Sequence, residues 1–274
     1  MNINSASPVH FLEVATEAAR EAGAILMAGH GRPKKISYKG EVDLVTEADK
    51  RSEAAIVARL QRNFPQHAIV AEEGSGGEAA AGGRYVWYVD PLDGTTNFAH
   101  GYPCFAVSIA LHEAGEALAG VVFDPVRDEL FSAMRGEGAY LNNKRIRVSV
   151  VERLSTALLA TGFPSHKRSE NPNIHFYWNF TLRSHGVRRD GSAALDLCYV
   201  ACGRFDGFWE FGLKSWDTAA GMLLVREAGG MVTDIAGRPY HPGDKDILAS
   251  NGKIHSEMQK AAAEIAERAA KNPL

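Results

Sequence analysis

The sequence predicts a mixed α/β protein, for three reasons. Apolar residues three and four positions apart indicate helices near both ends of the chain and within its second half. Short segments rich in β-branched and aromatic residues follow one another between residues 84 and 149, separated by turn residues, as in an antiparallel sheet. After about residue 148, apolar strands alternate with helices, which is typical of a second α/β layer.

The first half of the chain, residues 1–147, should contain two helices and most of the sheet. The Ser7-Pro8 pair is a typical helix start, and the helical pattern continues to the glycines near residue 30. A second helix should begin at Thr46 and stop before Pro65, with Ala54, Ile56, Val57 and Leu60 on or near its apolar face. The other expected segments are a hairpin at 36–46 turning at Gly40, a strand at 67–74, a glycine-rich surface loop at 74–83, and strands at 84–90, 104–113, 117–125, 129–136 and 138–149.

The second half, residues 148–274, reads as alternating strands and helices. No break in composition separates it from the first half, so we expect one compact unit. The expected strands lie at 156–164, 204–212 and 247–252, with a short strand or turn at 185–191 and a hairpin at 231–240. Helices are expected at 171–183, 192–203, 216–230 and 254–271.

Composition excludes several classes of protein. The chain has 274 residues, is 45% hydrophobic and 23% charged, and carries a formal net charge of −3. That balance is typical of a soluble globular protein and argues against general nucleic-acid or membrane-surface binding, which needs a basic excess. No segment has the length of a membrane span and no secretory signal is visible. Three cysteines without a disulfide spacing favour a reduced, cytoplasmic protein, and we interpret Cys198 and Cys202 as core residues rather than a redox or metal pair.

Carboxylates follow apolar segments at several places in the chain. Glu72 and Glu73 end one strand, and Asp90 ends the next in "WYVDPLDGTTNF". Asp93 follows after one turn, and Asp217 is at the start of an expected helix. Acids crowded at one end of a sheet repel one another and need cations. Oxygen ligands without histidine or cysteine favour Mg²⁺, with Mn²⁺ as the alternative, over zinc.

The turn after Asp90 supplies the other parts of a phosphate site. Pro91 and Gly94 allow a sharp reversal that would free the Leu92 carbonyl as a neutral ligand, and Asp90 can bridge two ions. Small and hydroxyl residues follow where a helix starts, and their N–H groups form a seat for phosphate. A lone D-P-L-D-G would more often be a capped turn, but that reading leaves the acids at 72 and 217 unexplained. Together the motifs favour metal-assisted phosphoester hydrolysis.

"VAEEG", "DPLDGTTNF" and "WDTAAG", in this order, resemble the signature of the inositol monophosphatase family. That family belongs to the Mg²⁺-dependent, lithium-sensitive phosphatases that include fructose-1,6-bisphosphatase. "DLVTEAD" at 43–49 and "GSAALDLCYVACGRFDGFWE" at 191–210 extend the resemblance over nearly the whole chain. The resemblance implies an αβαβα layered sandwich.

The resemblance also implies roles for individual residues. One Mg²⁺ would be held by Glu72, Asp90 and the Leu92 carbonyl, a second by Asp90, Asp93 and Asp217, and a weaker third with help from Glu72, so two to three ions are expected. Thr95 and Glu72 would position the attacking water. Residues implied to contact substrate are Gly94, Thr95 and Thr96 for the phosphate, and Arg188, Gly191, Ser192, Ala193 and Glu210 for the alcohol.

Three further positions are implied near the site, and two of them, Asp49 and Lys39, carry two interpretations each. Thr46-x-x-Asp49 is a capping box with Asp in place of Glu, and in the family the matching aspartate is also coupled to Thr95. Glu73 would contact the metal-binding residues rather than an ion. Lys39, on a segment that forms a flap in relatives, would approach the phosphate or simply be solvated.

The function that the resemblance implies is hydrolysis of inositol monophosphate, myo-inositol 1-phosphate above all, by a metal-activated water. Histidinol phosphate and sugar bisphosphates are the alternative substrates, and Glu210 with "GSAALD" favours a polyol. A different class is an interaction protein with a role in RNA metabolism, as in some bacterial relatives. The resemblance further implies a homodimer. From the charge balance we expect no membrane association and no direct nucleic-acid binding.

Overall fold

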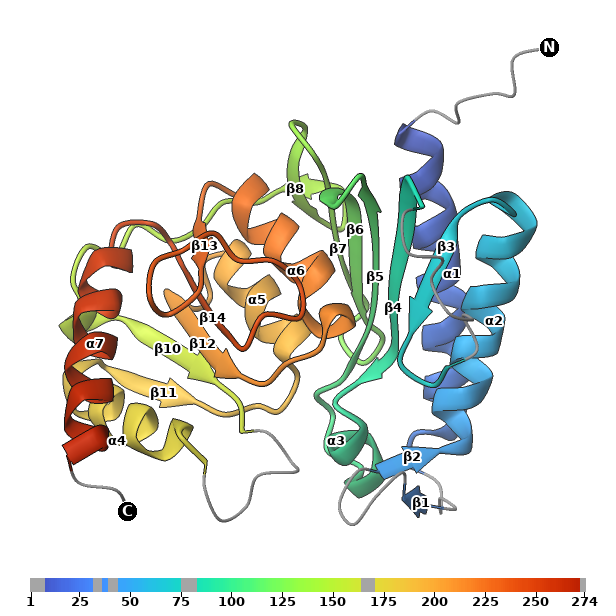
Figure 1. Ribbon diagram of the computed structural model, residues 1–274. Helices are drawn as coiled ribbons and strands as arrows, with labels where there is room; N and C mark the ends of the chain where they lie inside the picture. The colour runs from blue at the N-terminus through green and yellow to red at the C-terminus, as the bar shows by residue number, and fades with distance from the viewer. Residues whose placement is uncertain (1–7, 32–35, 39–43, 75–82, 164–170, 272–274) are drawn as a thin grey trace.

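A computed structural model describes residues 8–31, 36–38, 44–74, 83–163 and 171–271. Figure 1 shows five layers. Helices α1 (Pro8–Gly29) and α2 (Glu47–Asn63) cover the outer face of a seven-stranded sheet, α5 (Ala193–Ala201) and α6 (Ser215–Glu227) fill the space between the two sheets, and α4 (Asn173–Arg183) and α7 (His255–Lys271) cover a five-stranded sheet. The αβαβα layered sandwich is therefore confirmed.

The first sheet has the strand order β3-β4-β5-β6-β7-β8-β9. All of its pairs are antiparallel except β3–β4, which is parallel. Parallel pairing matters because the C-terminal ends of both strands then meet at one edge of the sheet. The strands are β3 (Ala68–Ala71), β4 (Tyr85–Asp93), β5 (Ala106–Glu113), β6 (Glu116–Asp124), β7 (Glu129–Met134), β8 (Gly138–Leu141) and β9 (Lys144–Arg145).

The second sheet has the order β11-β10-β12-β14-β13 and is mixed. Strand β10 runs parallel to both of its neighbours, whereas β14 is antiparallel to β12 and β13. The strands are β10 (Leu158–Thr161), β11 (Gly186–Arg188), β12 (Gly207–Phe211), β13 (Met231–Thr233) and β14 (Asp246–Ser250). The short elements are a two-stranded pair, β1 (Ile36–Tyr38) with β2 (Leu44–Thr46), helix α3 (Thr95–His100) and a 3₁₀ turn at Leu154–Thr156.

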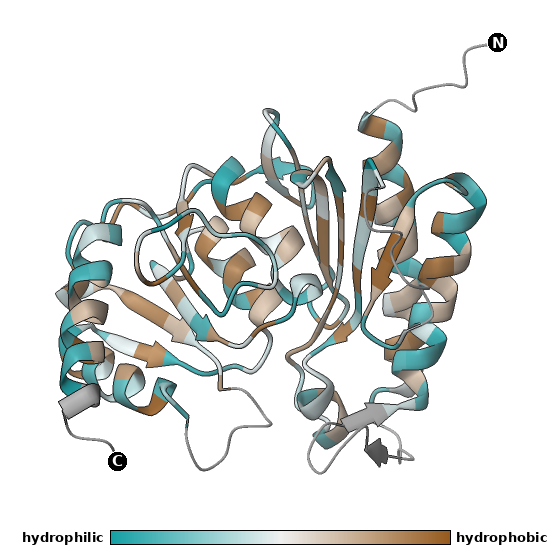
Figure 2. Cartoon of the chain, viewed as in Figure 1, coloured by the Kyte–Doolittle hydropathy of each residue, from teal (hydrophilic) through white to brown (hydrophobic). Residues whose placement is uncertain are grey.

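Buried apolar residues form three clusters between and beside the layers. Figure 2 shows hydrophilic positions along the outer helices α2 and α7. The central space is closed by α5 and α6 against both sheets: Val122 and Phe131 come from the first sheet and Phe208 and Ile247 from the second. Close packing here requires small residues, since a Cβ on Gly120 would lie 3.1 Å from the Ala220 Cα. The described part of the chain includes no helix long and apolar enough to cross a membrane.

Helix α2 starts where the sequence predicts it, because its capping box is formed. The Thr46 N–H donates to Asp49 Oδ2 at 2.9 Å, and the Ala48 N–H donates to Thr46 Oγ1 at 3.2 Å. The expected place of Ala54 is wrong, because that residue is exposed. The buried stripe keeps helical spacing but begins with polar residues: Asp49, Ser52, Glu53, Ile56, Val57 and Leu60.

Two strand boundaries also differ from expectation. Strand β4 does not end at Asp90 but continues to Asp93, with an irregularity in its pairing to β5 between these residues. Pro91 lies within that irregularity and has no N–H for the ladder. The expected hairpin at 231–240 is reduced to β13 and one isolated bridge, Thr233 to Pro239. Cys198 is buried and Cys202 is half-buried, and both are free thiols. The turn at Gly40, the Ser7 cap and most of the loop at 74–83 lie outside the described residues.

Candidate metal centre and active site

The parallel pair β3–β4 brings the first two acids together. Ala71 is the partner of Val89, so Glu72 directly follows β3 beside Asp90 of β4. The Glu72 N–H donates to the Val89 carbonyl at 3.2 Å, which ties the turn after β3 to the neighbouring strand. The carboxyls of Glu72 and Asp90 share a hydrogen bond. Two acids from separate strands therefore meet at one sheet edge.

Asp90 is the most enclosed of these acids, with 2% of its surface exposed. Its Oδ1 accepts the Leu92 N–H at 2.9 Å, which shapes the irregularity around Pro91. Burial first, and then the negative charges of Glu72, Asp93 and Asp217, raise the pKa of Asp90 well above its usual range. The same four acids named from the sequence thus interact in the folded chain.

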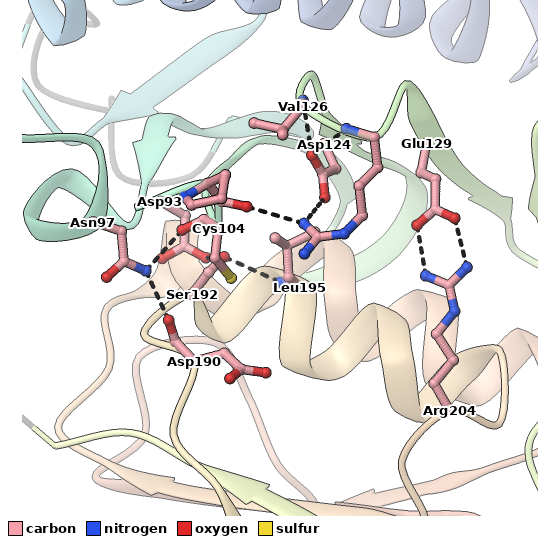
Figure 3. A network of polar contacts seen from close by, with 12 residues as sticks. Asp93, Asn97, Cys104, Asp124, Val126, Glu129, Asp190, Ser192, Leu195 and Arg204 are labelled. Carbon is pink, nitrogen blue, oxygen red and sulfur yellow. Dashed lines mark hydrogen bonds and ion pairs between the residues drawn. The ribbon is translucent and has the colours of Figure 1, made fainter. Parts of the chain in front are cut away.

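Asp93 is held from the other half of the chain (Figure 3). Its Oδ2 accepts the Ser192 hydroxyl at 2.6 Å and the Ala194 N–H at 2.8 Å, both from the start of α5. Burial raises the pKa of Asp93 to about 6, although these hydrogen bonds, with another from the Ala193 N–H, act to lower it. Ser192, which the resemblance implies as a substrate contact, donates its hydroxyl to Asp93.

Asp217 arrives on the first turn of α6. Its Oδ2 accepts the Lys214 N–H at 2.7 Å, as a residue three positions into a helix commonly does. Burial, followed by the charges of Asp93 and Glu72, raises the pKa of Asp217 well above its usual range, while the Lys214 backbone and side chain act to lower it. Helix α6 therefore orients this acid toward the cluster of the first sheet.

The donor set is suited to hard divalent cations. Asp90, Asp93 and Asp217 each commit one oxygen to a backbone or hydroxyl donor, and each has a second oxygen. In the described residues, no three acidic, histidine or cysteine side chains are already gathered around one point as ligands. A cation would draw these second oxygens together and remove the repulsion between the acids. The residues fit Mg²⁺ by their chemistry.

Asp49 both caps its helix and touches the site. Its Oδ2 accepts from the Thr46 N–H and hydroxyl, and its Oδ1 is 3.2 Å from Thr95 Oγ1. Thr95 Oγ1 is also 3.1 Å from the Leu92 carbonyl, so this carbonyl is not entirely free, contrary to the simplest expectation. Burial raises the pKa of Asp49, while the hydrogen bonds from Thr46 and Thr95 act to lower it.

The turn that precedes α3 needs glycine. Gly94 has φ of +97°, and a Cβ there would lie 2.9 Å from the Cys104 carbonyl and 3.3 Å from the Gly191 carbonyl. Thr95 begins α3, and Thr96 is exposed beside it. The three residues of the expected phosphate seat are therefore adjacent to Asp93.

Glu210 lies at the end of β12, with only 6% of its surface exposed, which rules out a merely solvated side chain. Burial, then the charges of Asp217 and Asp93, raise its pKa well above the usual range, and Arg189 acts to lower it. Gly162 lies against this carboxylate, because a Cβ at 162 would be 2.3 Å from both of its oxygens. Arg188 is exposed at the end of β11 and contacts the Val187 carbonyl, while Ala193 is buried in α5.

Sequence reasoning missed several residues around this cluster. Asn97 connects α3 to the loop before α5, and Glu53 accepts the Glu73 N–H at 2.6 Å, which anchors the turn after β3. Asp196 is buried in α5, and neither of its oxygens has a hydrogen-bond partner among the described residues; burial, followed by the charge of Glu210, raises its pKa. Only the helical spacing of "SAALDLC", which points Asp196 inward, could have indicated it. Lys39 lies outside the described residues.

Comparisons with known proteins agree with this geometry. A profile of the inositol monophosphatase family matches residues 8–271. A Synechocystis sp. protein named inositol-1-monophosphatase is 47% identical over 255 residues, covering 92% of this chain and 88% of that one. The Nus factor SuhB of Pseudomonas aeruginosa is 48% identical over 254 residues, covering 90% and 93%. The structure of inositol monophosphatase from Anabaena (Nostoc) sp. is 44% identical with a TM-score of 0.84, covering 93% and 96%. The chain therefore belongs to the inositol monophosphatase family.

Proposed function

We propose that this protein is a Mg²⁺-dependent phosphomonoesterase that hydrolyses myo-inositol 1-phosphate to inositol and phosphate. Members of the family generally depend on Mg²⁺. The observation that carries the proposal is the meeting of Glu72, Asp90, Asp93 and Asp217 beside the Asp49–Thr95 contact. Burying several carboxylates close together destabilises the folded state, so folding alone does not account for such a cluster.

The ligand assignment follows the positions of the acids. Glu72, Asp90 and the Leu92 carbonyl would hold one ion, Asp90, Asp93 and Asp217 a second, and Glu72 would help with a weaker third, with Mn²⁺ as an alternative metal. Bound Mg²⁺ would supply Lewis-acid stabilisation of the phosphate and of the departing alkoxide. By family likeness we also expect lithium to inhibit the reaction.

The chain's own groups would prepare the attacking water. When Thr95 Oγ1 donates to Asp49 Oδ1, a lone pair of its oxygen can accept a hydrogen bond from the water. Glu72, on the other side, would accept the second hydrogen of that water. The N–H groups of Gly94, Thr95 and Thr96 would hold the phosphate in line with it.

The alcohol part of the substrate would lie against Glu210 and the loop before α5. Glu210 is buried near Asp217, Asp93 and Arg189, and its carboxyl group is suited to hydrogen bonds with the hydroxyl groups of a polyol. Gly191 and Ala193 flank this space, and Arg188 would be near its rim. Histidinol phosphate and sugar bisphosphates remain the alternative substrates.

Phosphate release from myo-inositol 1-phosphate and histidinol phosphate, each with Mg²⁺ and with chelator, tests the proposal. We expect Mg²⁺-dependent turnover that favours the inositol ester. Asp93→Asn should lower turnover by about 100-fold or more, because it removes one ligand charge at constant size. The matched control is Asp128→Asn, an exposed aspartate paired with Arg20. A preference for histidinol phosphate would change the substrate only, and turnover that ignores chelator would overturn the mechanism.

A second role is favoured by the relative named Nus factor SuhB. We propose that this chain can also act through a partner in RNA metabolism, without direct nucleic-acid binding. Pull-down from lysate with the Asp93→Asn variant separates the two roles, since partner capture should survive when hydrolysis is lost. Capture that disappears together with hydrolysis would contradict an independent role.

We also propose a homodimer. Helix α4 exposes Ile174, Trp178 and Leu182, which are four positions apart and 43%, 66% and 70% exposed. Such a stripe on one helix face is unusual for a surface that meets only water. Light scattering on a sizing column should give twice the chain mass of 29.7 kDa. Trp178→Glu should shift the protein toward the monomer, and a wild-type monomer would contradict the proposal.

A further inference from the structure

Asn97 connects three segments of the chain that surround the acid cluster (Figure 3). Its Nδ2 group donates to the Cys104 carbonyl at 2.7 Å and to the Asp190 carbonyl at 2.7 Å, and a third carbonyl, that of Gly191, is 3.3 Å away. A carboxamide nitrogen has two hydrogens, and the two short contacts use both. The Asn97 side-chain nitrogen therefore acts as a donor toward three surrounding carbonyl oxygens.

The segments meet so closely that side chains are excluded between them. Gly191 has φ of +83°, and a Cβ there would lie 3.1 Å from Asn97 Nδ2. A Cβ on Gly94 would lie 2.9 Å from the Cys104 carbonyl. The close contacts around Asn97, Gly94 and Gly191 form a junction. It joins the turn before α3, the residues just before β5 and the loop between β11 and α5, and it is too tightly packed to admit a Cβ at either glycine.

The junction is one residue away from the contact that orients Asp93. Ser192 follows Gly191 directly and donates its hydroxyl to Asp93 Oδ2 at 2.6 Å, and the Ala194 N–H donates to the same oxygen. Movement of the Asp190 and Gly191 carbonyls would therefore move the donors that hold a candidate metal ligand. Among the described residues, the Asn97 side chain donates to backbone carbonyls and to none of the four acids, so its effect on them passes through this loop.

We propose that Asn97 is a positioning residue that holds the phosphate turn, Asp93 and the alcohol-side loop at residues 188–193 in one fixed arrangement. The inference rests on the proposed function for the identity of the reaction, but not for the geometry. Its consequence is a coupling: the loop that would contact the alcohol also sets the position of Asp93. A substitution that removes the donor at Asn97 should then both weaken Mg²⁺ binding and raise the KM for the phosphate ester.

An isosteric change tests the donor role. Asn97→Asp keeps the size of the side chain but replaces the donating NH₂ by an acceptor that faces three carbonyl oxygens, so it should be more harmful than Asn97→Ala. The matched control is Asn142→Asp. Asn142 also joins two segments by its amide, donating to the Asp128 carbonyl at 2.9 Å and accepting the Leu130 N–H at 2.9 Å, in the turn after β8.

Mg²⁺ binding measured by calorimetry without substrate is the first readout, and the KM and kcat for phosphate release are the second. We expect Asn97→Asp to weaken Mg²⁺ binding by about 10-fold or more, with Asn97→Ala between it and wild type and Asn142→Asp unchanged. Thermal melts identify folded variants. If Asn97→Asp does not fold, Asn97→Ser, which retains one donor, should show the weaker binding.

Wild-type Mg²⁺ affinity in the folded Asn97→Asp or Asn97→Ser variant would overturn the inference. So would an equal loss in Asn142→Asp, because a general loss of stability would then be the cause. The binding readout also separates this inference from the proposed function. A wild-type protein that binds Mg²⁺ but leaves inositol phosphate intact would refute the substrate and leave the positioning role testable.

Discussion

The contact between Gly162 and Glu210 is a residue-scale feature that connects backbone shape to substrate choice. Because a Cβ at 162 would lie 2.3 Å from both carboxylate oxygens, Gly162→Ala must displace Glu210. We expect the preference for a polyol phosphate over a simple alkyl phosphate to fall about 10-fold, with kcat for the simple ester retained. The kcat/KM ratio for the two esters measures this.

Gly29→Ala is the control for that change, since a Cβ on Gly29 would meet its nearest atom at an ordinary 3.5 Å. This variant should keep the wild-type ratio. If Gly162→Ala also kept it, Glu210 would not be a substrate contact.

At this scale, the sequence identified the acids but not what surrounds them. Glu72, Asp90, Asp93 and Asp217 could be predicted because each lies in a short motif of known chemistry. The donor to Asp93 could not, because Ser192 is 99 residues away in the chain and the two meet only through α5. Asn97 was missed for the same reason, since its partner Asp190 is 93 residues away. Motifs therefore indicate the candidate acids, whereas tertiary contacts decide what orients them.

At the scale of elements, His255 joins three of them. It begins α7, its Nδ1 is 2.9 Å from Ser250 Oγ of β14, and its Nε2 is 3.0 Å from Thr233 Oγ1 of β13. Burial lowers the pKa of His255 to about 4 from its usual 6.5. The folded protein therefore holds this imidazole neutral, and the unfolded chain binds a proton more readily.

The contribution of His255 to the free energy of unfolding should therefore be fully present above pH 6.5. It should decrease as the pH falls from 6.5 toward 4. The expected loss is on the order of 3 kcal/mol. Urea unfolding at pH 7 and pH 4.5 measures it, and His255→Gln should remove this part of the slope. His185→Gln, at an exposed position, is the comparison. An unchanged slope in His255→Gln would show that other groups account for the acid sensitivity.

Elements themselves were more predictable than their ends. The capping box at Thr46 indicated the start of α2, and the hairpin turns indicated the antiparallel run from β5 to β9. Strand β4 passes the point where Pro91 and the acids suggested a stop, because β5 continues to pair with Asp93 beyond the irregularity. Ala54 lies outside the buried stripe of α2 because that stripe starts with polar and acidic residues, which local hydrophobicity does not reveal. Local patterns therefore identify segments, and neighbouring strands decide their length.

At the scale of the whole molecule, α5 and α6 belong to both sheets. Their side chains share one apolar cluster with residues of β6 and β7 on one side and β12 and β14 on the other. We therefore predict that the chain unfolds as one cooperative unit, as the continuous composition also suggested. Calorimetry should show a single transition whose calorimetric and van't Hoff enthalpies agree, and Mg²⁺ should shift all of it upward. Two transitions would divide the molecule near residue 147.

The central position of these two helices also has a consequence for synthesis of the chain. A ribosome makes the seven strands of the first sheet before it makes residues 193–227, at about 5–20 residues per second. For several seconds, the inner face of that sheet, with Val122 and Phe131, lacks the helices that later cover it. Asp217 joins the other acids only when α6 has been made and has packed against this sheet. The nascent chain is thus exposed to aggregation before its candidate metal centre is assembled, so conditions that slow translation through this interval should lower the yield of folded protein before they affect its activity.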